Sequence, residues 1–192
     1  MSAVTLTSGR PPVSGPMTVA DLDRTPDDGR RYELVDGVLT VSPAPVIAHQ
    51  VVLLELAVLL RANCPAELRV VPEPGLRMSG ITELVPDLAL VRREELVGRQ
   101  LTVPPLLVAE VRSPSTAMFD MNTKKAVYER FAIPSYWIIV PDPGQPAVYA
   151  YELQDGRYEE IAHVTGDQQF NAERPFPVTV TPSRLVADLL TR

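Results

Sequence analysis

Apolar positions along the chain fall into short runs, and the spacing within each run predicts the element that it forms. The stretch from Val46 to Asn63 is apolar on nearly every side, which predicts a helix buried all round. The run from Leu106 to Val111 does not alternate, so it predicts a central strand covered on both faces. The residues Ser113 to Thr116 predict the cap of a following helix over about 117–131, which Ile133-Pro134 ends.

Weaker patterns predict the remaining elements. Thr18 and Asp21 form a capping-box pattern for a short helix that ends at about Arg24. Asp36-Gly37 and Asp155-Gly156 each lie between two β-prone runs and predict two hairpins. Further strands are expected at about 68–72, 76–79, 86–91, 136–140 and 177–180, with helical stretches near 93–97 and 182–190. This mixture of strands and helices predicts an α/β fold in which a mixed β-sheet is flanked by helices.

Length and composition indicate a single domain in the cytoplasm. The chain has 192 residues, and the aperiodic segment 1–16 is expected to be a flexible tail before one domain over 17–192. The single cysteine, Cys64, excludes an internal disulfide and a cysteine-rich zinc site. No apolar run is long enough to span a membrane, and the N-terminus has no signal-peptide pattern. We therefore expect a cytoplasmic protein with no membrane partner.

The charge pattern restricts how a phosphate-bearing partner would bind. The net charge is −6, which is unlike the broad basic surface of a sequence-reading nucleic-acid binder. The middle segment 87–140 carries seven basic and six acidic residues, so a phosphate is expected to dock there or through a metal ion. The aromatic residues are few and lie within strands, which does not indicate a base-stacking platform.

Three acidic residues stand in or beside apolar strands, where an unpaired carboxylate is costly. They are Glu33, Asp87 and Glu110. Each alone could form an ion pair with one of the sixteen arginines. Two carboxylates on neighbouring central strands, however, would offer oxygen ligands to a hard cation such as Mg²⁺, and the backbone carbonyl of Val111 could add another.

The only two lysines, Lys124 and Lys125, lie on the helix that follows Glu110. The four-residue spacing of Asp120, Lys124 and Tyr128 places these three side chains on one helix face. Lys125 points about a quarter-turn away and is expected to face solvent. Lys124 near a metal-bound water would orient that water or stabilise the phosphate. Its ammonium is compact and can lose its proton, whereas the guanidinium of arginine stays protonated.

Four motifs in this order resemble the Uma-type restriction endonuclease family of the PD-(D/E)XK nuclease superfamily. They are YELVDGVLTVSPAPVIAHQ at 32–50, PDLALV at 86–91, LLVAEVRSPST at 106–116 and DMNTKKAVYERFAIPSYWIIVPD at 120–142. The resemblance extends from about Met17 to the C-terminus. It implies a restriction-endonuclease-like fold, a Mg²⁺ or Mn²⁺ cofactor and DNA as the substrate. Because cutting both strands usually takes two sites, we expect a homodimer.

The resemblance also implies roles for particular residues. Asp87 and Glu110 would be metal ligands, Lys124 would be the catalytic lysine, and Glu33 and His49 match further site positions. A lone histidine such as His49 is otherwise more often a core residue or a cap, and His163 has no support from the motifs.

The sequence departs from the superfamily at the position two residues after the glutamate. Arg112 stands there in place of the usual lysine, so we assign the lysine role to Lys124 and keep Arg112 as a possible phosphate contact.

Two functions of different classes are consistent with these residues. The first is metal-dependent hydrolysis of phosphodiester bonds by the carboxylates and Lys124. The second is a catalytically silent nuclease-fold module for binding or dimerisation, which the acidic net charge favours. A weaker third is a metal-dependent hydrolase of small phosphoesters. Retention of two carboxylates and a lysine favours the enzyme.

Overall fold

The computed structural model describes residues 15–112 and 119–190. The tail expected over 1–16 lies almost wholly outside the described residues, and so does the helix cap expected at 113–116. The expected α/β architecture with a mixed sheet and flanking helices is confirmed.

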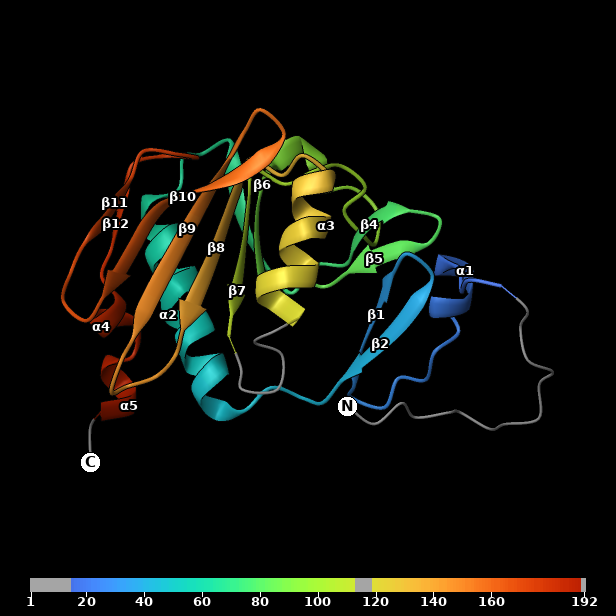
Figure 1. The fold of residues 1–192 in the computed structure, drawn as a ribbon, viewed down its shortest axis with the longest axis horizontal. Helices are drawn as coiled ribbons and strands as arrows, with labels where there is room; N and C mark the ends of the chain where they lie inside the picture. Colours follow the sequence, from blue (N-terminus) through green and yellow to red (C-terminus); the bar gives the residue numbers. More distant parts are fainter. Residues whose placement is uncertain (1–14, 113–118, 191–192) are drawn as a thin grey trace.

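Six strands form the main sheet, in the order β10-β9-β8-β7-β6-β3 (Figure 1). They are β3 Leu68–Pro72, β6 Leu88–Arg92, β7 Leu107–Val111, β8 Ser135–Val140, β9 Ala147–Gln154 and β10 Arg157–Thr165. Only β7 and β8 pair in parallel, and the other neighbours are antiparallel. Every residue of β7 is buried, as its non-alternating apolar pattern predicts.

A second sheet of four strands lies beside the main one, in the order β2-β1-β5-β4. Its strands are β1 Arg31–Val35, β2 Val38–Ser42, β4 Leu76–Ser79 and β5 Thr82–Leu84. The β1–β2 hairpin turns at Asp36-Gly37, as expected, with a φ of 80° at Gly37. A side chain at residue 37 would also collide with Pro16. The sequence did not predict β5 or the division into two sheets, because both depend on long-range pairing.

Short elements complete the fold. Helix α1, Val19–Leu22, starts with the expected capping box of Thr18 and Asp21. A 3₁₀ turn covers Arg93–Glu95. Strands β11 (Phe170–Ala172) and β12 (Val178–Val180) form a small ribbon, and the expected closing helix is two short helices, α4 Pro182–Leu185 and α5 Ala187–Leu190.

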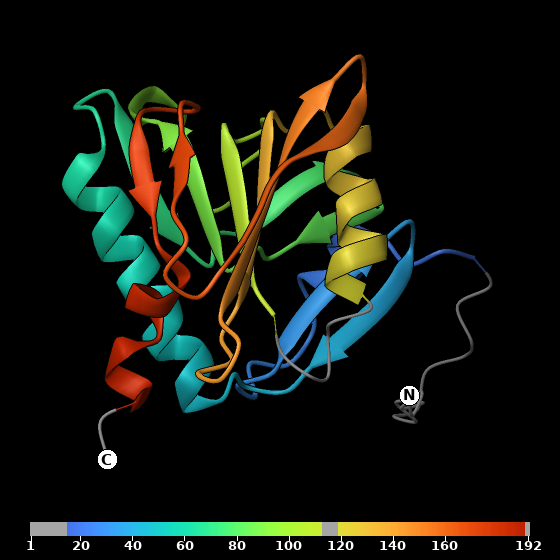
Figure 2. The ribbon, with the colours of Figure 1, turned by 60° about the vertical axis from the view of Figure 1, so that its left-hand side comes forward.

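The two longer helical segments cover opposite faces of the main sheet (Figure 2). Helix α2, Ile47–Asn63, packs on one face over a core that includes Leu56, Ala109 and Trp137. Helix α3, Lys125–Arg130, follows a π-helical turn over Phe119–Lys124 and packs on the other face. There it covers Val108 and Tyr136. Residues 117 and 118 of the expected helix over 117–131 lie outside the described part, and of the rest only Lys125–Arg130 is regular α-helix.

Helix α2 is amphipathic, although its sequence predicts burial on all sides. Leu56 is fully buried, whereas Leu54 is 61% exposed and Ile47 and Val58 are also exposed. The helix covers the sheet with one stripe only, so the apolar residues of its other side meet solvent. Among the described residues, no helix is long and apolar enough to cross a membrane.

Candidate active site

Asp87 lies immediately before β6 and is held by three neighbours. Its carboxylate is 2% exposed. The Arg31 guanidinium donates to Oδ1 at 2.7 Å, and the Val111 N–H donates to Oδ2 at 2.8 Å. His49 Nε2 lies 2.9 Å from the same Oδ2. The geometry therefore places Asp87 and His49 together, as the motifs imply.

These contacts set the charge of Asp87. Burial by itself would raise the pKa of this carboxyl. The hydrogen bond from His49 and the positive charges of His49 and Arg31 outweigh burial and hold the pKa of Asp87 well below its usual range. Asp87 is thus an anion at neutral pH.

Lys124 joins two buried carboxylates on the other side of the site. Its Nζ lies 3.0 Å from Glu33 Oε1 and 3.1 Å from Glu110 Oε1. Tyr128 Oη donates to the same Glu110 oxygen at 2.6 Å. The four side chains are all buried, and Lys124 is only 3% exposed. A buried carboxylate pair of this kind needs such donors, because an unpaired charge there would be strongly destabilising.

Helix geometry explains why Lys124 and Tyr128 reach one oxygen. Lys124 is the last residue of the π-helical turn and has helical dihedral angles, and Tyr128 lies four residues later in α3. The predicted common face of these two residues is confirmed, while the side chain of Asp120 lies outside the described part. Burial, followed by the charge of Glu110, raises the pKa of Tyr128 well above its usual value, so Tyr128 remains a donor.

Lys125 does not face solvent as expected. Its Nζ lies 3.6 Å from the centre of the Tyr151 ring, and burial lowers its pKa. The helix packs against the sheet closely enough that a side chain a quarter-turn from Lys124 still reaches β9. This contact is a cation–π interaction.

The two halves of the site are joined by neighbouring residues on two strands. Glu110 belongs to the Lys124 cluster, and the next residue, Val111, donates to Asp87. On β1, Glu33 reaches Lys124 while Arg31 reaches Asp87. Residues two apart on a strand share a face. That spacing is the signal that could have identified Arg31, which the sequence reasoning missed.

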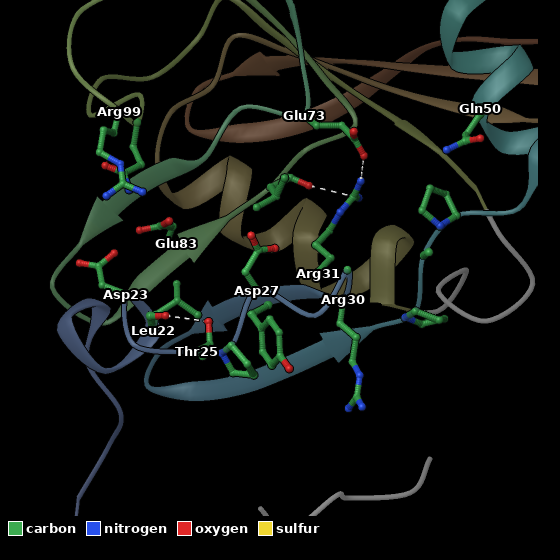
Figure 3. Close-up of a pocket in the computed structure, with 18 residues that line it drawn as sticks. Leu22, Asp23, Thr25, Asp27, Arg30, Arg31, Gln50, Glu73, Glu83 and Arg99 are labelled. Atoms are coloured by element: carbon green, nitrogen blue, oxygen red, sulfur yellow. Dashed lines mark hydrogen bonds and ion pairs between the residues drawn. The ribbon is translucent and has the colours of Figure 1, made fainter.

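A polar pocket of about 580 Å³ borders the Asp87 half (Figure 3). Arg31 lines this pocket and forms an ion pair with Glu73 at its wall, while its other nitrogen reaches Asp87. Gln50, next to His49 on α2, lines the same pocket. Asp87 itself does not line the pocket, so the ion pair with Arg31 is what connects the pocket to Asp87.

The donors fit a hard divalent cation in kind. Asp87, Glu33 and Glu110 supply carboxylate oxygens, the ligands that Mg²⁺ and Mn²⁺ prefer. The Lys124 ammonium against two of them shows that this position accepts a cation. Within the described ranges, however, no three His, Cys, Asp or Glu side chains are grouped closely enough to hold a metal ion. Ligation by Asp87, Glu110 and Val111 stays a prediction.

His49 contributes one further feature. Its Nδ1 is buried and has no hydrogen-bond partner among the residues that the structure describes. A buried ring nitrogen without a partner is costly in free energy. This atom is therefore open to a proton or a polar ligand that enters the site.

Arg112 does not join the cluster of Glu110 and Lys124. It follows β7 and lines a second pocket together with Tyr149 and His163. Arg112, which stands where the resemblance leads us to expect a lysine, thus lines a different cavity, while Lys124 reaches Glu110 from the helix.

Comparisons with known proteins agree with this fold. A solved structure described as a putative nuclease from Anabaena variabilis is similar to the chain, with a TM-score of 0.72 and 17% sequence identity. The similarity covers 91% of this chain and all of that one. No curated protein matches the chain significantly. The family model of Uma2, described as "Putative restriction endonuclease", matches residues 19–187. The chain, with its buried carboxylates and Lys124, therefore belongs to the Uma2 family of nuclease-like proteins.

Proposed function

We propose that the protein is a divalent-metal-dependent endonuclease that hydrolyses phosphodiester bonds in DNA. One observation carries the proposal: Lys124 contacts the Glu110 carboxylate, and the adjacent Val111 N–H contacts Asp87. Two buried anions and a lysine, linked through adjacent residues of one strand, are the groups that metal-assisted hydrolysis of a phosphodiester would use.

Asp87 and Glu110, with the Val111 carbonyl, would hold the Mg²⁺ or Mn²⁺ ion. When bound, such an ion lowers the pKa of a coordinated water and neutralises negative charge on the phosphate. The compact ammonium of Lys124 lies beside Glu110, and its N–H groups would stabilise the charge that develops on the phosphate oxygens. Tyr128 holds Glu110 in position through its hydroxyl.

Glu33 and His49 complete the site in different ways. Glu33 accepts the Val85 N–H at 2.8 Å and also contacts Lys124, so it positions the lysine. His49 is oriented by Asp87 at Nε2, which leaves Nδ1 as the ring atom that would shuttle a proton or contact a ligand.

The test is cleavage of plasmid DNA by the purified protein with Mg²⁺ or Mn²⁺, and with EDTA as the metal-free control. Asp87→Asn and Glu110→Gln preserve shape, so each should abolish cleavage while circular dichroism stays unchanged. Glu73→Gln is the matched control, because Glu73 lies at the pocket wall and contacts Arg31 instead of the proposed ion. Failure of the wild type to bind Mn²⁺ in calorimetry would exclude the proposal.

A second candidate is a catalytically silent module for binding or dimerisation. One observation favours it: each buried carboxylate already has an internal cationic or hydroxyl partner, which a purely structural network would also have. Metal binding separates the two, since a silent module predicts no calorimetric signal and no cleavage. Release of nitrophenol from bis(p-nitrophenyl) phosphate without DNA cleavage would instead favour a hydrolase of small phosphoesters.

The proposal includes a homodimer, because one such site cuts one strand and a two-fold axis supplies the second. Sedimentation velocity at several protein concentrations measures the oligomeric state. A monomer at all concentrations would restrict the proposed activity to single cuts.

A further inference from the structure

A row of side chains crosses the main sheet from the candidate site to the last hairpin. The register pairs Glu110 with Ile138, Ile138 with Tyr149, and Tyr149 with His163. Paired residues point to the same face of a sheet, so all four lie on the face that α3 covers in part. Neighbouring strands are about 4.8 Å apart, which places Tyr149 about 10 Å and His163 about 14 Å from Glu110 at the backbone.

The end of this row is an aromatic stack. The rings of Tyr149 and His163 lie 4.1 Å apart between centroids and 17° from parallel. His163 is exposed and Tyr149 is half-buried. The sequence did not indicate a stacking platform, because these two residues are fourteen positions apart and meet only through the pairing of β9 with β10.

The stack lines a pocket of about 440 Å³ that also contains Arg112. The Arg112 N–H donates to the Ile139 carbonyl at 2.8 Å, which fixes its backbone just beyond Val111. Among the described residues, no carboxylate pairs with its guanidinium. The pocket thus combines a half-buried cation with an aromatic surface, two residues along the chain from Glu110.

We propose that this pocket binds one nucleotide of the DNA strand, about three to four nucleotides away from the phosphate that is cut. The Arg112 guanidinium would hold a phosphate through its planar pair of donors, and the outer face of the Tyr149–His163 stack would hold a base. Successive nucleotides of a stacked strand rise about 3.4 Å. The row therefore spans about three to four nucleotides. The DNA identity of the strand rests on the proposed function.

The test measures binding of a fluorescein-labelled single-stranded DNA oligonucleotide to the full chain by anisotropy, in EDTA, so that no cleavage occurs. Arg112→Gln should weaken binding about tenfold and reduce the slope of log K against log salt by about 0.7, since one phosphate contact is lost. The control Arg157→Gln removes an equal charge at the far end of β10 and should change binding less than twofold.

The stacking part is tested with two variants of one residue. His163→Ala should weaken binding about tenfold, as loss of one base–aromatic stack does, while His163→Phe keeps an aromatic ring and should restore binding. Thermal unfolding of both variants separates a loss of binding from a loss of folding.

Three results would overturn the pocket. They are no oligonucleotide binding by the wild type, equal binding by Arg112→Gln and Arg157→Gln, or equal binding by the alanine and phenylalanine variants of His163. Cleavage with Mn²⁺ is measured in parallel. If the wild type cleaves DNA and Arg112→Gln binds the oligonucleotide as well as the wild type does, only the proposed pocket is refuted. If Arg112→Gln binds more weakly but the wild type cleaves no DNA, only the proposed nuclease function is refuted.

Discussion

Lys124 Nζ lies 3.1 Å from Glu110 Oε1, although the two residues belong to different elements. Glu110 is in β7 and Lys124 begins the helix that follows it, so the lysine approaches the carboxylate from above the sheet instead of along the strand. The next position on the strand that shares a face with Glu110 is Arg112, which serves another pocket.

Lys124→Arg should lower DNA cleavage by about 10² or more, because a planar guanidinium does not replace a point donor in a buried site. Initial cleavage rates with Mn²⁺ give the measurement. The control is Lys125→Arg, which keeps a cation over the Tyr151 ring and should be nearly silent. Full activity of the Lys124 variant would show that lysine-specific chemistry is not used.

Arg31→Gln should lower the free energy of unfolding by about 3 kcal/mol, because it removes a cation from a buried carboxylate. Urea denaturation measures this loss. Arg30→Gln is the matched control, since Arg30 is exposed and, within the described part of the chain, pairs with nearby Asp28. It should change stability by no more than about 0.5 kcal/mol. Similar losses in both variants would mean that Arg31 does not support Asp87.

The same ion pair predicts an acid dependence of stability. The pKa of Asp87 is lowered in the folded state, so its contribution is present above the unfolded pKa of about 4 and is lost as the pH falls. Wild type should therefore lose stability below about pH 4 more steeply than Arg31→Gln. If the free energy of unfolding falls equally with pH in both proteins, Arg31 does not lower the pKa of Asp87.

Buried tyrosines predict an alkaline limit to stability. Burial and nearby glutamates raise the pKa of Tyr151 to about 12, and they also raise the pKa values of Tyr128 and Tyr158 well above the usual value. Unfolded tyrosines ionise near pH 10. Stability should therefore be complete below about pH 10 and decrease as the pH rises toward the folded pKa values.

Absorbance near 295 nm measures tyrosine ionisation directly in the native and the urea-unfolded protein. Of the six tyrosines, Tyr128, Tyr151 and Tyr158 should stay neutral in the native state at pH 11 and be ionised in the unfolded state. Coincident titration of all six in both states would contradict the burial of these hydroxyls.

Two leucines of α2 give a matched test of its packing. Leu56→Ala should cost about 2–5 kcal/mol of unfolding free energy, because Leu56 is fully buried in the core. Leu54→Ala, two residues earlier and mostly exposed, should cost less than about 0.5 kcal/mol. If the two variants lose the same unfolding free energy in thermal denaturation, α2 is buried on all sides.

The sequence predicts the parts of the site that depend on local spacing. Lys124 and Tyr128 share a helix face because four residues make about one helical turn. The apolar run through Glu110 indicates a central strand, and β7 is one. The motifs also identify Glu33, Asp87 and His49, which the fold brings to the same region.

Features that depend on long-range pairing were not predictable in the same way. Arg31 reaches Asp87 across fifty-six residues of chain, and β5 exists because it pairs with β1 and β4. Lys125 contacts Tyr151 only because α3 lies against β9. Helical spacing alone gives the direction of such a side chain but not what lies opposite it.

Strand β10 changes phase once, between Glu160 and Ala162. Before this bulge, Tyr158 packs on the α3 side, whereas after it Ala162 and Val164 pack on the α2 side. Strict alternation from Tyr158 would instead turn His163 toward α2. The bulge at Ile161, which takes up one residue without a partner on β9, thus decides which side of the sheet His163 serves. A β10 without Ile161 would lose the bulge but keep His163 opposite Tyr149, because Glu160 and Ala162 already pair with adjacent residues of β9.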